Sequence, residues 1–80
     1  MTESIYSARY RRLCKLLVEA RKAKGLSQAA LAERLGWLQT TISKYERGER
    51  RLDLIEFLGV TQALEIDPHR IIRRLKATDA

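Results

Sequence analysis

The chain has 80 residues, and 16 Lys and Arg against 10 Asp and Glu give it a net charge of +6. This length allows one domain with one modest core, which leaves little room for a pocket that encloses a large cofactor. The positive charge indicates a polyanionic partner, either nucleic acid or an anionic membrane surface, whereas 45% hydrophobic residues exclude a disordered basic tail.

Apolar residues recur at helical intervals, and glycines or capping side chains separate the segments in which they do so. Gly25, Gly36 and Gly48 each close a segment, because a residue with positive φ commonly ends a helix. Asp67-Pro68 opens the last one. The predicted helices cover residues 5–24, 28–35, 39–47, 54–64 and 68–76. We therefore predict an all-α fold, a compact five-helix bundle.

The last two helices are expected to use their apolar residues differently. The inner face of the fourth helix is predicted to comprise Leu54, Phe57, Leu58, Val60 and Leu64. In the fifth helix two isoleucines are adjacent and cannot both face one core. We therefore predict a two-fold contact between copies of the chain. The candidate residues for this dimer interface are Ile66, Ile71, Ile72 and Leu75, with Ile5 and Tyr6 as further ones.

The most informative stretch is SQAALAERLGWLQTTISKYERG, residues 27–48. It contains two short helices separated by a three-residue turn that starts at Gly36, and apolar residues on both helices hold the pair together. The second helix of the pair exposes four polar side chains opposite its apolar face, namely Gln39, Thr40, Ser43 and Lys44. Such side chains donate and accept hydrogen bonds, which suits the edges of base pairs in a major groove.

This pattern resembles the Cro and phage-repressor-like helix-turn-helix regulators, the XRE family. The residues that carry the resemblance are Leu26, Ser27, Gln28, Leu31, Ala32, Leu35, Gly36, Ile42, Ser43, Tyr45, Glu46, Arg47 and Gly48. The resemblance implies a lambda-repressor-like DNA-binding domain over residues 13–76. Residues 1–12 would then extend the first helix, and residues 77–80 would fray. It further implies a regulator, most simply a repressor, that binds a palindromic operator in double-stranded DNA as a homodimer.

The resemblance also assigns roles to individual residues. Base contacts are expected from Gln39, Thr40, Ser43 and Lys44. Phosphate contacts are expected from Gln28, Arg47, Arg50 and Arg51. Arg21 in the first helix is expected to form an ion pair with Glu46. Two positions depart from the family pattern, because Trp37 stands in the turn and Glu65 replaces a glycine that commonly follows the fourth helix.

Other classes of function fit the sequence less well. One His, one Cys and the lack of a phosphate-binding glycine loop or paired acids argue against an enzyme, a cofactor and a metal site. The apolar faces of all five segments are needed for one core, so membrane binding is not expected. A single Cys14 and no visible signal peptide favour the cytoplasm. The alternative function is a protein-interaction module, such as an antitoxin or adaptor, with DNA binding secondary.

Overall fold

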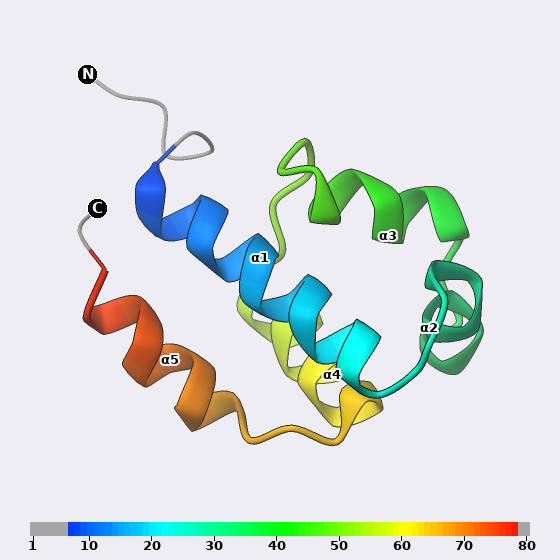
Figure 1. The fold of residues 1–80 in the computed structure, drawn as a ribbon. Helices are drawn as coiled ribbons and strands as arrows, with labels where there is room; N and C mark the ends of the chain where they lie inside the picture. The colour runs from blue at the N-terminus through cyan, green and yellow to red at the C-terminus, as the bar shows by residue number, and fades with distance from the viewer. Residues whose placement is uncertain (1–6, 79–80) are drawn as a thin grey trace.

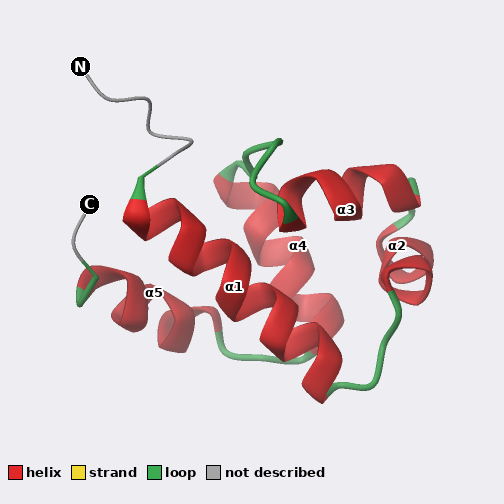
Figure 2. Cartoon of the chain, turned by 45° about the horizontal axis from the view of Figure 1, so that its top comes forward, coloured by secondary structure: helices red, strands yellow, loops and turns green. Residues whose placement is uncertain are grey.

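The computed structural model describes residues 7–78, and all regular secondary structure in that range is helical (Figures 1 and 2). The helices are α1 (Ala8–Ala23), α2 (Gln28–Leu35), α3 (Gln39–Glu46), α4 (Leu54–Leu64) and α5 (Pro68–Lys76). The predicted all-α, five-helix fold is thereby confirmed. Residues 1–6 and 79–80 lie outside the described residues, and so do the predicted interface candidates Ile5 and Tyr6.

The helix ends follow local chemical signals. The side-chain oxygen of Ser7 accepts a hydrogen bond from the N–H of Tyr10 at 3.0 Å, so α1 begins at Ala8 and not near residue 5 as predicted. The side chain of Asp53 caps α4 in a reciprocal arrangement with Glu56. These caps satisfy backbone N–H groups that the first turn of a helix otherwise leaves without partners.

Glu65 ends α4 in the left-handed conformation, with a φ of 58°. It is the one residue other than glycine with a positive φ between residues 7 and 78. Its carboxylate forms an ion pair with the Nζ of Lys24 at the end of α1. The hydrogen bond from Lys24 lowers the pKa of Glu65 because it stabilises the charged carboxylate. The departure noted in the sequence therefore has a structural consequence, a strained backbone at this helix end.

Glu65→Gly is expected to raise the free energy of unfolding by about 1 kcal/mol, because glycine adopts the left-handed conformation without steric cost. Glu65→Ala is the matched control, since it removes the ion pair with Lys24 but keeps a side chain at the strained position. The alanine variant is expected to be no more stable than the original chain. Urea unfolding followed by circular dichroism measures both. Equal stability of the two variants would show that the left-handed backbone at residue 65 is not strained.

The core lies between α1 and the other four helices. Its buried residues are Leu16, Leu17, Leu31, Ala32, Ile42, Tyr45, Phe57, Val60, Leu64 and Ile71. α1 packs against α3, α4 and α5, while α2 packs against α3 and α4. In both ribbon views α1 runs between α3 on one side and α5 on the other (Figures 1 and 2). This arrangement leaves α2 and α3 together at one side of the bundle, away from α5.

The structure corrects two sequence expectations about apolar residues. Leu54 and Leu58 were predicted to face the core, but they are 65% and 41% exposed. Ile71 was predicted as a dimer contact left over from the core, but it is itself a core residue at 7% exposure. Its neighbour Ile72 is 37% exposed. Ile66 and Leu75, the other predicted contacts, are half-buried and pack against the core.

Tyr45 is fully buried, and its hydroxyl has no hydrogen-bond partner among the described residues. Burial raises the pKa of this phenol because the phenolate would lose its hydration. Tyr45→Phe is expected to raise the free energy of unfolding by about 1 kcal/mol, since the unpaired hydroxyl is removed and the ring is kept.

The matched control is Tyr10→Phe, because the hydroxyl of Tyr10 donates a hydrogen bond to the carbonyl oxygen of Arg50 at 2.9 Å. This control is expected to lower stability by about 1 kcal/mol. Thermal unfolding of both variants measures the difference. A loss of stability in Tyr45→Phe equal to that in the control would show that the Tyr45 hydroxyl does have a partner.

Candidate nucleic-acid interface

The short helices α2 and α3 are joined by a tight turn. Gly36 ends α2 with a φ of 71°, a left-handed conformation that glycine adopts at no steric cost. The N–H of Trp37 then donates to the carbonyl of Ala32 at 2.9 Å, which closes the turn, and the half-buried Trp37 side chain packs against the core. Ile42 and Tyr45 fix the inner face of α3, because both are fully buried. The opposite face of α3 is left to solvent.

The outer face of α3 carries the residues predicted to contact bases. Gln39, Thr40 and Lys44 are exposed, while Ser43 is half-buried. The hydroxyl of Ser43 donates to the carbonyl oxygen of Thr40 at 3.3 Å. The spacing of the four residues puts them on one side of the helix. The structure thus brings together a row of polar side chains of the kind that reads base edges.

Leu38 is a feature that the sequence reasoning did not assign. It is the residue before α3, and its side chain is 72% exposed. A leucine beside the first residue of this polar row adds an apolar contact surface next to Gln39. No periodic pattern distinguishes it from a buried leucine, and only its position in the turn reveals the exposure.

The ion pair predicted between Arg21 and Glu46 is present and joins α1 to α3. The Nε of Arg21 lies 2.7 Å from one oxygen of Glu46 and its Nη2 lies 3.1 Å from the other, which is a two-point contact. The two side chains are only 9% and 5% exposed. Arg21 also donates to the carbonyl of Leu26 at 2.8 Å, and the amide of Gln28 donates to Glu46 at 2.9 Å. This cluster fixes the position of α3 relative to the end of α1 and the start of α2.

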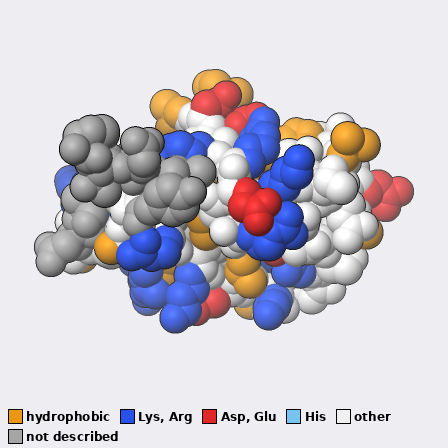
Figure 3. Space-filling view, turned by 90° about the horizontal axis from the view of Figure 1, so that it is seen from above, with side chains coloured by type: hydrophobic (Ala, Val, Ile, Leu, Met, Phe, Trp, Pro, Cys, Tyr) orange, Lys and Arg blue, Asp and Glu red, His pale blue; other side chains and the backbone are white. Residues whose placement is uncertain are grey.

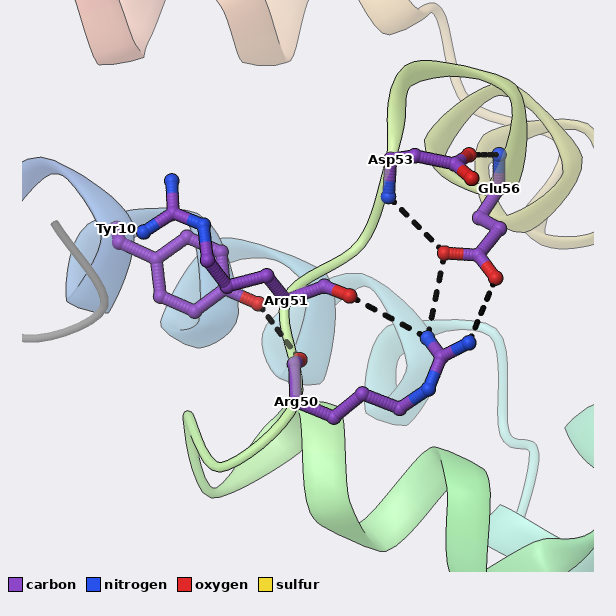
Figure 4. Close-up of polar contacts among 5 residues, drawn as sticks. All are labelled: Tyr10, Arg50, Arg51, Asp53 and Glu56. Atoms are coloured by element: carbon purple, nitrogen blue, oxygen red, sulfur yellow. Dashed lines mark hydrogen bonds and ion pairs between the residues drawn. The ribbon is translucent and has the colours of Figure 1, made fainter.

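Arg50, in the loop after α3, is held by a carboxylate of α4 (Figure 4). Its two Nη atoms lie 3.2 and 2.8 Å from the oxygens of Glu56. The same Glu56 accepts from the backbone N–H of Asp53 at 3.0 Å as part of the α4 cap. The hydrogen bond from Arg50 lowers the pKa of Glu56, since it stabilises the carboxylate. Arg50, which was predicted to contact phosphate, therefore also links this loop to α4.

Arg51 has a different environment from its neighbour. Its guanidinium carbon lies 4.6 Å from the centre of the Tyr10 ring, a cation–π contact with α1 (Figure 4). It is exposed and forms none of the ion pairs found between residues 7 and 78. Burial raises the pKa of Tyr10 to about 12. Arg51 thus presents an uncompensated charge from a fixed position.

Arg47, the third arginine of this loop, forms a two-point contact with Glu49. Its Nε and Nη2 lie 2.9 and 3.1 Å from the two carboxylate oxygens. The hydrogen bond from Arg47 lowers the pKa of Glu49. Both side chains are more than half exposed, so a phosphate can compete with this pair in water.

Basic side chains are spread over the side of the molecule on which α3 lies (Figure 3). Within residues 7–78 no cluster of His, Cys, Asp and Glu is placed to hold a metal ion. The described helices are too short or too polar to span a membrane. The geometry therefore combines a polar, exposed helix face with neighbouring arginines, which is an arrangement suited to the groove and backbone of a duplex.

Comparison with known proteins identifies a family and similar solved structures. The family model described as helix-turn-helix matches residues 17–71. A solved structure of an XRE-family like protein from Pseudomonas syringae pv. tomato str. DC3000 is 46% identical, with a TM-score of 0.85 over 92% of this chain and 90% of that chain. The restriction-modification controller protein C.AhdI from Aeromonas hydrophila is 35% identical, with a TM-score of 0.75 over 81% of this chain and 98% of that chain.

A more distant controller protein shows the same fold. C.Esp1396I, solved as a tetramer in complex with its natural 35 base-pair operator, is 24% identical, with a TM-score of 0.78 over 89% of this chain and 93% of that chain. The search among curated proteins found no match.

Proposed function

Because the chain belongs to the XRE family of helix-turn-helix DNA-binding transcriptional regulators, we propose that it represses transcription as a homodimer on a palindromic operator. The observation that carries this proposal is the row of exposed polar side chains on α3, directly opposite its fully buried face. Occupancy of a promoter by the dimer is enough to repress. We place this activity in the cytoplasm, where a buried thiol such as Cys14 stays reduced.

In this proposal α3 enters the major groove and reads bases through its outer face. The amide of Gln39 bonds an adenine at two points, while Thr40, Ser43 and Lys44 contact neighbouring bases. The exposed Leu38 contacts a thymine methyl group, for which its apolar side chain is suited.

Phosphate contacts fix α3 in the groove. We assign the leading contact to Arg51, because no carboxylate compensates its charge in the described structure. Gln28 has two amide N–H donors, and with one bound to Glu46 the other serves a phosphate oxygen. Arg47 and Arg50 are secondary contacts, since each shares its guanidinium with a carboxylate.

For the dimer interface we propose the exposed apolar face of α4, with Ile72 of α5 as a peripheral contact. Leu54, Ile55 and Leu58 are 65%, 73% and 41% exposed and lie within five residues of one another. Apolar side chains gathered on one helix face indicate a protein contact. This face follows directly after the loop that leaves α3, so a two-fold contact through it fixes the spacing of two α3 helices.

Ile55→Asp is expected to weaken the dimer by about 100-fold or more, because the symmetric contact loses two buried isoleucines at about 1.5–3 kcal/mol each. Ile72→Asp is the matched control, the same change in an exposed isoleucine of α5. It is expected to leave most of the dimer intact. Sedimentation equilibrium over a concentration series measures both. If Ile72→Asp dissociates the dimer and Ile55→Asp does not, the interface lies on α5 and not on α4.

Selection of binding sites from random duplex DNA tests the function itself. The expected result is an enriched sequence with two inverted half-sites whose centres lie about 10 base pairs apart, or a multiple of one helical turn. Failure to enrich any sequence would refute specific DNA binding. Enrichment of an isolated half-site would refute the palindromic homodimer while leaving base recognition in place.

A further inference from the structure

The exposed face of α5 carries positive charge that the rest of the described structure does not neutralise. Arg70, Arg73, Arg74 and Lys76 are all exposed within one nine-residue helix. None of them takes part in the ion pairs formed between residues 7 and 78. A single isoleucine of this helix is buried, so α5 places most of its surface outside the core.

This positive surface is remote from the helix that reads DNA. α5 packs against α1, and α1 separates it from α3 in both ribbon views (Figures 1 and 2). A duplex seated on α3 therefore lies on the other side of the bundle. The charge of α5 calls for a different partner.

An apolar groove runs along α5 beside these cations. It lies between α1 and α5 and has a volume of about 430 Å³. Its apolar lining comprises Leu16, Ala20, Ala23, Leu64, Ile66 and Ile71. The two alanines on α1 leave space that larger side chains would fill. The groove can thus accept apolar side chains from outside.

The charged residues at the edge of the groove leave its α5 side with a net positive charge. Lys24 is paired with Glu65. Asp67 caps α5, since its carboxylate accepts from the N–H of His69 at 2.9 Å. Two cations of α5, Arg70 and Arg74, then line the groove, and neither forms an ion pair with another residue between 7 and 78. Glu19 on the α1 side is the one remaining acidic residue of the lining.

We propose that this groove binds an acidic amphipathic helix of a second protein. Arg70 and Arg74 lie one helical turn apart, about 5–6 Å between their Cβ atoms, which matches two carboxylates one turn apart on a facing helix. The apolar side chains of that helix occupy the floor, as in other helix-in-groove contacts. A nucleic-acid backbone offers phosphates to the arginines but nothing apolar for the floor, so the lining favours a protein. DNA binding through α3 stays free.

The test uses the full 80-residue chain and a fluorescein-labelled peptide of about 18 residues, long enough to form a helix. Leucines at helical spacing form one face of the peptide and glutamates the other. Fluorescence anisotropy is expected to show saturable binding that weakens with salt. A peptide with glutamines in place of glutamates, and a 20-base-pair duplex as competitor, complete the design.

Two variants locate the site. Arg70→Glu with Arg74→Glu is expected to weaken peptide binding about tenfold or more, because two attractive pairs become repulsive. Arg73→Glu with Lys76→Glu is the matched control, the same charge change on α5 at residues that do not line the groove. This control is expected to weaken peptide binding by less than half the factor found for Arg70→Glu with Arg74→Glu. Ala23→Phe keeps the charge but fills the groove, and it is expected to abolish binding.

The outcomes separate the alternatives. Equal losses in the two charge-reversal variants would overturn the proposal, because binding would then follow net charge and not the groove. Binding that survives Ala23→Phe would also overturn it. The third outcome concerns the variant Gln39→Ala with Arg51→Ala. If the duplex displaces the peptide from this variant, the groove of α5 is a second nucleic-acid surface and the proposal is overturned. Circular dichroism and operator binding of each variant show that the fold and the α3 surface are intact.

Discussion

Arg21→Met is expected to lower the free energy of unfolding by about 3–5 kcal/mol, the largest effect of any single substitution considered for this chain. The methionine fills much of the same space but leaves the carboxylate of Glu46 buried, with a side chain only 5% exposed. The amide of Gln28 then remains as its one hydrogen-bond donor among the side chains of the described residues. The carbonyl of Leu26 loses a donor as well.

The double variant Arg21→Met with Glu46→Leu distinguishes a stranded charge from a lost attraction. Replacing both members of a buried pair with apolar residues of similar size is often close to neutral, so the double variant is expected to recover most of the loss. Urea unfolding at one fixed protein concentration measures the original chain and both variants, because the stability of the proposed dimer depends on concentration. A double variant as unstable as Arg21→Met would show that the pair itself, and not the stranded carboxylate, stabilises the fold.

Local signals in the sequence were sufficient to predict the helices. Asp67 caps α5 in the structure as its position suggested, and Ser27 and Asp53 cap α2 and α4 in the same way. Ser7 was overlooked because the apolar spacing continued through Ile5 and Tyr6. A hydroxyl three residues before a free N–H is a stronger signal for a helix start than periodicity, since it satisfies a specific backbone donor.

The orientation of α4 could not be read from its own sequence. Six of its residues are Leu, Ile, Phe or Val, so a helical period fits more than one face. The structure settles the matter by packing Phe57, Val60 and Leu64 inward and leaving Leu54 and Leu58 outside. The adjacent isoleucines of α5 were judged correctly as a pair that cannot both be buried. Which of them faces the core depends on contacts with α1, which periodicity within α5 does not contain.

The surroundings of the candidate phosphate contacts depend on residues far away along the chain. Tyr10 lies 40 residues before Arg50, whose carbonyl oxygen it binds, and its ring holds Arg51. Glu56 is six residues after Arg50, beyond the reach of the spacing rules for a single helix. The sequence could therefore nominate a cluster of arginines, but only the fold separates a compensated arginine from an uncompensated one.

Gln39→Ala and Arg51→Ala are expected to weaken operator binding in different ways. A glutamine that bonds adenine at two points discriminates by about 1–3 kcal/mol in each half-site, so Gln39→Ala should flatten preference at one base pair and leave the salt dependence unchanged. Arg51→Ala should weaken operator and scrambled duplex by similar factors and reduce the salt slope by about one for each contacted phosphate. Arg51→Lys, which keeps the charge, is the control that should retain the slope.

Binding of these variants to both duplexes over a salt series checks the assignment of the two surfaces. The contrast follows from structure, because Gln39 begins the exposed face of α3 whereas Arg51 is held against Tyr10 in the loop beyond it. A base contact acts through fixed geometry and releases no counterions, whereas a phosphate contact acts through charge at any sequence. If Gln39→Ala weakens operator and scrambled duplex equally, α3 is not the reading element, and Arg51 and the other phosphate contacts would have to account for binding without sequence preference.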